Sequence, residues 1–139
     1  KRDEIKFYYR NVPELRRNYA LEATFAGVPS DQQAIQEKLN ESRHHRNTTQ
    51  PKAASAGCTF KNPAVCGAGQ LIDEMGLKET GVGKAEVSPE HGNFIVNRGK
   101  ASASDVISLI ETIKAKAKED RGVVLETEIQ ILGEDEVVF

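Results

Sequence analysis

The chain has 139 residues, of which 29% are charged and 38% hydrophobic, and its formal net charge is −2. These values are typical of one soluble domain or a compact part of a larger protein, and they argue against a disordered or fibrous chain. The charge is nearly balanced and no apolar run reaches the about 20 residues of a membrane helix, so we expect neither a nucleic-acid partner nor a membrane.

The N-terminal part of the chain is predicted to contain two strands and a helix. Residues 5–10 are rich in β-branched and aromatic types and residues 18–25 alternate weakly, so both segments are predicted to be strands. Ser30 followed by Gln33 has the pattern of a capping box, which predicts a helix that continues to about His45. Its narrow apolar stripe predicts that this helix lies on a surface.

The middle of the chain is predicted to consist of short elements. Residues 46–57 have no periodicity and are predicted to be a loop. Residues 67–75 have apolar residues at helical spacing, and Gly76 provides the C-terminal stop. We expect short extended pieces and turns over 77–92 and a short strand over 93–97.

The C-terminal part gives the clearest patterns and, with them, the fold class. Ser102 with Asp105 predicts the start of a helix that Gly122 ends. Its buried stripe is expected to comprise Val106, Leu109, Ile110, Ile113 and Ala117. Residues 123–132 alternate and are predicted to be a strand whose second face carries Glu126 and Glu128. Helices and strands are interspersed without a regular strand–helix–strand repeat, so we predict an α+β fold with a mixed sheet.

The cysteines and the first residue bear on cellular context. Cys58 and Cys66 are the two cysteines, with no CxxC spacing and no histidine pair at zinc spacing, so neither a disulfide framework nor a metal site is expected. A reducing, cytoplasmic location fits best. The chain begins with Lys1 and no apolar signal segment follows, so we expect a processed or truncated piece.

Two catalytic patterns can be weighed against ordinary structural explanations. Gly81-Val82-Gly83-Lys84-Ala85 has neither the spacing nor the hydroxyl residue of a phosphate loop, so a glycine turn is favoured. Cys58 and His91 form a possible nucleophile and base, but nothing local marks either as catalytic, and a structural histidine is favoured. Taken singly, the candidate residues do not identify a function.

Several motifs become specific when their order is considered. They are Tyr9-Arg10-Asn11; Arg46 with Gln50-Pro51; Ser55-Ala56-Gly57-Cys58-Thr59-Phe60-Lys61-Asn62-Pro63; Gly67-Ala68-Gly69-Gln70-Leu71-Ile72-Asp73-Glu74; Val87-Ser88-Pro89-Glu90-His91 with Asn93-Phe94-Ile95-Val96-Asn97; and Leu125-Glu126-Thr127-Glu128-Ile129. Over roughly residues 5–134 the chain resembles the C-terminal half of the UDP-N-acetylenolpyruvoylglucosamine reductase (MurB) family, flavoenzymes of bacterial peptidoglycan synthesis. The short separation of Arg10 from Cys58 resembles the compact type that lacks a substrate-capping tyrosine insert.

The resemblance implies a reaction and a set of cofactors. NADPH would reduce bound FAD, and the reduced flavin would pass a hydride to the double bond of UDP-N-acetylglucosamine enolpyruvate. A protein acid would then protonate the neighbouring carbon to give UDP-N-acetylmuramate. The implied protein is a cytoplasmic oxidoreductase of cell-wall biogenesis, which serves cell shape and cell division.

The resemblance also implies roles for five residues. Cys58 corresponds to the family's proton donor, where many relatives carry serine; a thiol, with an ordinary pKa of about 8.5, is a stronger acid than an alcohol. Arg10 and Glu128 match the groups that stabilise negative charge on the substrate carboxylate. Asn62 and Arg46 match residues near the substrate diphosphate. The turn at 55–57 would present the thiol to the reacting carbon.

The resemblance further implies a division of the chain. Residues 1–46 would be the tail of an FAD-binding domain, 47–125 the substrate-binding domain, and 126–139 a strand returning toward the flavin domain. The glycine-rich flavin loops are absent from the sequence, so the cofactor-binding residues stay unassigned. We expect this piece to be inactive alone, to bind neither FAD nor NADPH tightly, and to bind the UDP-sugar weakly. Gln130 stands where many relatives carry a basic residue.

Two other function classes stay open from the sequence alone. One is a non-catalytic UDP-sugar-binding or regulatory module that has lost its flavin partner. The presence of Arg10, Cys58 and Glu128 together argues against it, because a pure binder need not keep them. The other is a cysteine hydrolase that uses Cys58 and His91.

Overall fold

A computed structural model describes residues 4–16 and 18–133, and the chain divides into two compact units. The first unit ends at Glu41 and the second begins at Ser42, so the boundary falls inside helix α1 (Gln32–Thr49). No helix in the described ranges is both long enough and apolar enough to cross a membrane.

The described part of the first unit has little regular structure. Tyr8 and Asn11 form an isolated antiparallel bridge, and Pro13–Arg16 form a 3-10 helix. The predicted strands at 5–10 and 18–25 are therefore wrong. A strand needs a neighbour for its backbone N–H and C=O groups, and no described segment of this unit pairs with either of them.

Helix α1 begins and ends later than predicted. A carboxylate oxygen of Asp31 accepts a hydrogen bond from the Ala34 N–H at 2.9 Å, so Asp31 is the capping residue rather than Ser30. The helix continues beyond His45 to Thr49, where the hydroxyls of Thr48 and Thr49 donate to backbone carbonyls of the preceding turn. No residue of α1 is buried, which agrees with the predicted surface helix.

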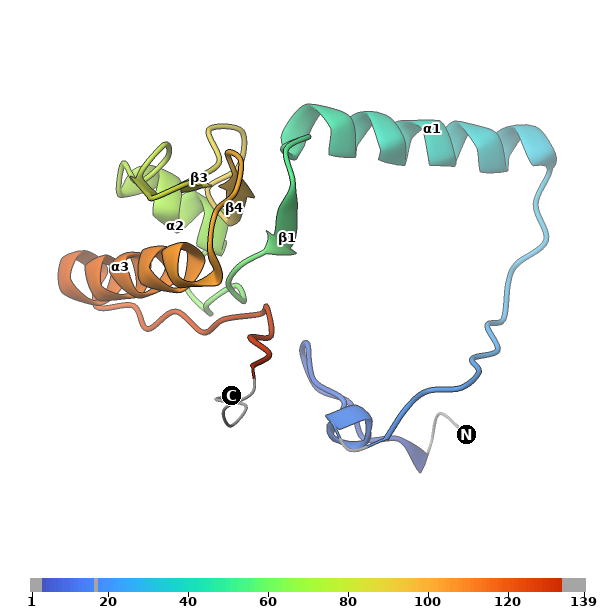
Figure 1. The fold of residues 1–139 in the computed structure, drawn as a ribbon. Coiled ribbons are helices and arrows are strands. Elements are labelled where there is room, and N and C mark those ends of the chain that lie inside the picture. Colours follow the sequence, from blue (N-terminus) through green and yellow to red (C-terminus); the bar gives the residue numbers. More distant parts are fainter. Residues whose placement is uncertain (1–3, 17, 134–139) are drawn as a thin grey trace. The chain divides into compact units, whose positions relative to one another are not determined.

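The second unit contains an antiparallel sheet with two helices (Figure 1). The strand order is β1-β4-β3-β2, and the strands are β1 (Ser55–Cys58), β2 (Gly81–Val82), β3 (Ala85–Val87) and β4 (Phe94–Asn97). The α+β class is confirmed. The described sheet is antiparallel rather than mixed, because each pair of neighbouring strands in it runs in opposite directions.

The helices and the central hairpin follow the sequence signals closely. Helix α2 (Ala68–Glu74) ends before Gly76, and α3 (Ala103–Arg121) begins with the Ser102–Asp105 capping box and ends at Gly122, whose φ is 65°. Residues 81–85 form the β2–β3 hairpin with a two-residue turn, as the prediction of a glycine turn requires.

The core of the second unit lies between α3, α2 and the sheet. Its buried residues include Phe60, Ala68, Leu71, Ile72, Leu77, Ala85, Val87, Ile95, Leu109, Ile110, Ile113, Ala117 and Leu125. The predicted stripe of α3 is confirmed, with Val106 partly buried at its edge. Helix α3 packs against β2 and β3.

The predicted strand over 123–132 is largely wrong. Thr127 forms an isolated antiparallel bridge with Phe60, and the remaining described residues of this segment belong to no strand. The alternation is kept in part, because Leu125 is buried while Val124 and Glu126 are exposed. Residues 134–139 of the predicted segment 126–139 lie outside the described residues.

Candidate functional site

Cys58 is the last residue of strand β1, directly after an irregularity in that strand. Between the paired positions Ser55↔Val96 and Cys58↔Phe94, β1 advances by three residues and β4 by two, so β1 contains a bulge. Gly57 has a φ of 86°, which favours glycine. The loop predicted for 46–57 is wrong at both ends, because α1 continues to Thr49 and β1 begins at Ser55. A bulge redirects the side chain that follows it, and this one precedes the half-buried Cys58.

The residues after Cys58 are held by Asn93, which is 3% exposed. The Asn93 side-chain oxygen accepts a hydrogen bond from the Phe60 N–H at 2.8 Å, and its side-chain nitrogen donates to the Phe60 carbonyl at 2.8 Å. The Asn93 backbone carbonyl accepts from the Thr59 N–H at 2.8 Å. Asn93 therefore continues the β1–β4 pairing beyond Cys58 by means of its side chain.

Glu128 is brought to the opposite side of the same segment. The Glu128 N–H donates to the Thr59 carbonyl at 2.8 Å, and the Lys61 N–H donates to the Glu126 carbonyl at 2.9 Å. These two bonds flank the bridge between Phe60 and Thr127. Glu128 therefore pairs with the residue next to Cys58, and its own side chain is half-buried.

The other residues of the Cys58 motif have structural contacts as well. The Lys61 ammonium forms an ion pair with Glu126 at 2.9 Å. The Asn62 side-chain oxygen accepts from the Ala68 N–H at 3.0 Å and so supplies a hydrogen bond to the first turn of α2. That bond orients the amide of Asn62, an exposed residue, so that its NH₂ group remains as a donor.

A cleft of about 340 Å³ lies against the junction at which residues 59–61 meet residues 126–128. It is lined by Ala54, Ser55, Ala56, Thr59, Ile95, Val96, Asn97, Val106 and Ile129. Its walls include Ser55 and Ala56 of β1, Thr59, the residue after Cys58, and Ile129, the residue after Glu128. Mostly nonpolar walls with a few hydroxyl and amide groups are typical of a site for a small organic group.

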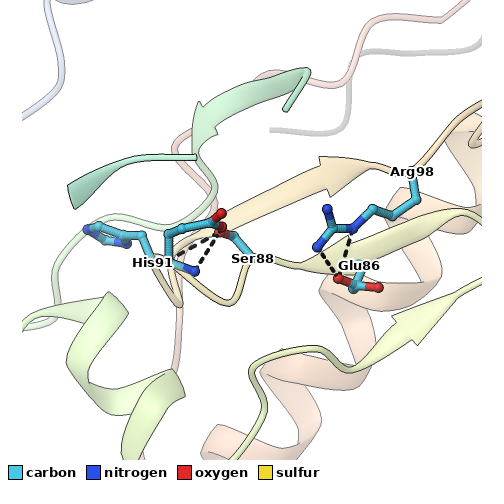
Figure 2. A network of polar contacts seen from close by, with 5 residues as sticks. Glu86, Ser88, His91 and Arg98 are labelled. Atoms are coloured by element: carbon cyan, nitrogen blue, oxygen red, sulfur yellow. Dashed lines mark hydrogen bonds and ion pairs between the residues drawn. The ribbon is translucent and has the colours of Figure 1, made fainter. Parts of the chain in front are cut away.

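His91 belongs to a separate polar cluster in the turn between β3 and β4 (Figure 2). The Ser88 hydroxyl donates to Glu90 at 2.6 Å and accepts from the His91 N–H at 3.3 Å, and the bond from Ser88 holds the pKa of Glu90 below its ordinary value. The Arg98 guanidinium contacts Glu86 nearby.

The His91 ring is held by one hydrogen bond and one aromatic contact. The imidazole Nδ1 accepts from the Asn93 N–H at 3.1 Å, and the ring packs edge-on against Phe94 with centroids 4.9 Å apart. Burial lowers the pKa of His91. Within the described ranges no hydrogen bond joins His91 to Cys58, so the geometry does not support a cysteine–histidine catalytic pair.

The two arginines predicted for the site come from other elements of the chain. Arg10 is in the first unit, at the turn between Tyr8 and Asn11, with a φ of 55° and its guanidinium carbon 5.7 Å from the Tyr9 ring centroid. Arg46 is an exposed residue in the last turn of α1. Of the five predicted residues, the structure brings together Cys58 and Glu128, with Asn62 four residues further along the Cys58 segment.

The sequence reasoning missed Asn93. The sequence predicts Asn93, between Gly92 and the apolar run at 94–96, only as the first residue of a strand. An amide placed there, directly beside a strand of apolar residues, is the one signal that pointed to a buried hydrogen-bonding group.

Among the described residues, no group of His, Cys, Asp and Glu is suited to hold a metal. Gly83-Lys84 forms the turn between β2 and β3, and there a Cβ added to Gly83 would meet the carboxylate of Asp105. A carboxylate at this position repels a phosphate.

Comparison with known families gives a match to residues 50–132. The family described as UDP-N-acetylenolpyruvoylglucosamine reductase, C-terminal domain, matches this range. Similar curated proteins include UDP-N-acetylenolpyruvoylglucosamine reductases of Clostridium novyi (strain NT), 43% identical over 136 residues, and of Syntrophus aciditrophicus (strain SB), 42% identical over 135 residues. The matches cover 96% of this chain in both cases, but 44% and 43% of those two proteins.

A solved structure agrees with the sequence matches. The crystal structure of UDP-N-acetylenolpyruvylglucosamine reductase (MurB) from Thermus caldophilus is similar with a TM-score of 0.61 and 46% sequence identity, over 70% of this chain and 34% of that chain. The chain therefore spans less than half the length of the relatives that it matches.

Proposed function

The chain belongs to the family of UDP-N-acetylenolpyruvoylglucosamine reductase C-terminal domains, and on this premise we propose that it supplies the substrate side of that reductase. The complete enzyme would reduce UDP-N-acetylglucosamine enolpyruvate to UDP-N-acetylmuramate in peptidoglycan precursor synthesis, in the cytoplasm. The observation that carries this proposal is the pairing of the Cys58 segment with the Glu128 segment, in a chain that is 43% identical to a named reductase.

Cys58 is the proton donor of the proposed reaction. Hydride addition to one carbon of the enolpyruvyl double bond leaves an electron pair on the neighbouring carbon, conjugated with the substrate carboxylate. The S–H bond of Cys58 breaks, its proton forms the new C–H bond, and the thiolate is reprotonated by solvent. The position of Cys58 after a bulge and beside the cleft supports this role, because a donor must reach the reacting carbon.

Glu128 acts on the same intermediate from the adjacent segment. Its backbone is fixed by the hydrogen bond to Thr59, and its half-buried carboxyl group can hydrogen-bond to the developing enediol. Arg10 contributes a guanidinium, whose planar fork suits a carboxylate. A site that only bound the sugar would need neither a proton donor nor a group that stabilises charge on the substrate.

Asn62 and Arg46 bind the diphosphate in this proposal. The hydrogen bond of the Asn62 oxygen to Ala68 N–H leaves the amide NH₂ as the donor, which is the correct end for a phosphate oxygen. Arg46 is exposed in the last turn of α1 and supplies a positive charge.

FAD and NADPH belong to the complete enzyme, where the flavin would supply the hydride. The sequence carries no glycine-rich flavin loop, which supports the proposal that other parts of the enzyme hold that cofactor. We accordingly propose the division inferred from the resemblance: residues 1–46 as the tail of the flavin domain, 47–125 as the substrate domain and 126–139 as the returning segment.

The test uses the complete reductase that contains this chain, with Cys58→Ala and Cys58→Ser compared. We expect the alanine variant to lose turnover by a factor of about 100 or more and the serine variant to retain much more of it. Both variants should still reduce their flavin with NADPH, because that step does not use Cys58. Full turnover of the alanine variant would overturn the role of the thiol.

The isolated chain offers a second test. We expect it to remain colourless after mixing with FAD and desalting, and to show weak binding of UDP-N-acetylglucosamine by NMR at residues near Asn62. Tight stoichiometric FAD retention would contradict the proposed division. Binding of the UDP-sugar by the chain, with no reductase turnover from the complete protein that contains it, would favour the non-catalytic module.

A further inference from the structure

We infer that Asn93 is a positioning residue that fixes Cys58 and Glu128 relative to one another. The inference rests on the proposed function only for the roles of those two residues. Its geometric content is independent of the reaction: one buried amide holds the segment to which both of them are attached.

The amide contacts the segment on one edge. Asn93 makes three hydrogen bonds of 2.8 Å to Thr59 and Phe60, two through its side chain and one through its backbone carbonyl. With its side chain 3% exposed, water cannot replace those bonds when they break. The backbone that leaves Cys58 is therefore fixed immediately after the thiol.

The other edge of the segment carries Glu128. Thr59 donates its N–H to the Asn93 carbonyl and accepts the Glu128 N–H at its own carbonyl. Phe60 is held by the Asn93 amide and is bridged to Thr127. Residues 59–61 thus lie between Asn93 and residues 126–128, and a shift of the segment away from Asn93 must move both Cys58 and Glu128.

Asn93 is itself anchored from two directions. Its N–H donates to the imidazole Nδ1 of His91, and the next residue, Phe94, pairs with Cys58 in the sheet. The preceding residue, Gly92, is buried against α2, where a Cβ would lie 2.6 Å from the Gly69 carbonyl oxygen. The amide is therefore presented from a closely packed turn.

The chemistry of the contact requires an amide. Phe60 offers one N–H and one carbonyl, and only a side chain that accepts at one atom and donates at the other satisfies both. An ionised aspartate keeps the acceptor but places negative charge against the Phe60 carbonyl. Alanine removes both bonds. Asn93→Asp therefore changes one bond at nearly constant volume, and Asn93→Ala removes both bonds together with the carboxamide.

The test measures the thiols and the backbone amides of the full 139-residue chain, without flavin or substrate. Iodoacetamide alkylation of Cys58 is followed by mass spectrometry from about pH 6 to 10, with Cys66 as the internal reference. In Asn93→Ala we expect the ratio of the Cys58 rate to the Cys66 rate to change by about 2- to 10-fold, the equivalent of one or more lost hydrogen bonds. A merely structural role, acting through global unfolding, would change both rates together.

Amide hydrogen exchange gives the second readout. The Glu128 N–H does not contact Asn93, and yet we expect its exchange to accelerate with that of the Phe60 N–H by about tenfold in Asn93→Asp. The matched control is Asn97→Asp at the end of β4, because the Asn97 side-chain oxygen also accepts two backbone N–H groups, those of Gly99 and Ala101. It should leave both amides and the Cys58 rate unchanged.

The outcomes decide the inference in each case. An unchanged thiol ratio, or acceleration at Phe60 without Glu128, would overturn it. If the Asn93 variants fail to fold, amide hydrogen exchange is measured instead in the unsubstituted chain at increasing urea concentrations. We then expect the Phe60 and Glu128 amides to become exchangeable in one cooperative step. Opening of the two amides at different urea concentrations would overturn the inference. None of these results depends on whether the reductase reaction is the correct function.

Discussion

Replacement of Gly92 by alanine is expected to lower the free energy of unfolding of the second unit by about 2–3 kcal/mol, near the upper end for overpacking of a folded core. Gly92 is a buried residue in the turn that leads into Asn93 and β4. Its Cβ would lie 2.6 Å from the carbonyl oxygen of Gly69 and 3.2 Å from the Cβ of Ile72. Both neighbours belong to α2.

The size of the effect follows from what must move. A separation of 2.6 Å is roughly 1 Å shorter than the distance of about 3.5 Å at which nonbonded atoms attract most strongly. The obstructing oxygen is backbone, so no change of side-chain rotamer removes the overlap. Relief requires a shift of α2 or of the turn, and α2 carries the core residues Leu71 and Ile72.

The assay is urea unfolding of the full chain followed by circular dichroism at 222 nm. With a slope of about 1–3 kcal/mol per molar urea, the expected loss moves the midpoint by about 1 M or more. The control is Gly67→Ala at the start of α2, where a Cβ would meet nothing within 4 Å. Equal midpoints for Gly92→Ala and Gly67→Ala would refute the close-packing argument.

Three further predictions concern the same unit. Ser102→Ala removes the capping box of α3 and should cost about 1 kcal/mol in the same urea assay, whereas Ser104→Ala, inside the helix, should not; equal losses would contradict the capping role. Burial holds the pKa of His91 below its ordinary value, so as the pH falls this histidine takes up a proton in the unfolded chain before it does so in the folded chain. The free energy of unfolding should therefore fall as the pH drops below about 6.5, and this part of the fall should vanish in His91→Gln. The lowered pKa of Asp105, caused first by the Ser102 N–H, acts in a separate window, with its contribution lost below about pH 4. The side chains of the Lys61–Glu126 ion pair are 31% and 71% exposed, so Glu126→Gln should change the free energy of unfolding by about 0–1 kcal/mol. A loss of several kcal/mol would mean that this ion pair is what holds residues 59–61 against residues 126–128.

The site could be predicted from the sequence in part. The order of the motifs pointed to the reductase family, which is confirmed, and it selected Cys58 and Glu128, which the structure brings to adjacent positions. Their catalytic roles, and those of Arg10, Arg46 and Asn62, stay predictions. The Asn93 contact was missed because it joins residues 33 apart in the chain, and no local pattern encodes which backbone group a buried amide will meet.

The amino-acid sequence by itself determined the elements whose hydrogen bonds are local. Helices α2 and α3, the capping box at Ser102, the stop at Gly122 and the turn at residues 83–84 all depend on groups within a few residues of one another. Only the tertiary structure decided which extended segments became strands. Residues 5–10, 18–25 and 123–132 have suitable side chains, but a strand requires a partner from elsewhere in the chain. Residues 126–128 meet theirs at 59–61, where Lys61 and Glu126 are 65 residues apart, and that long-range pairing is what places Glu128 beside Cys58.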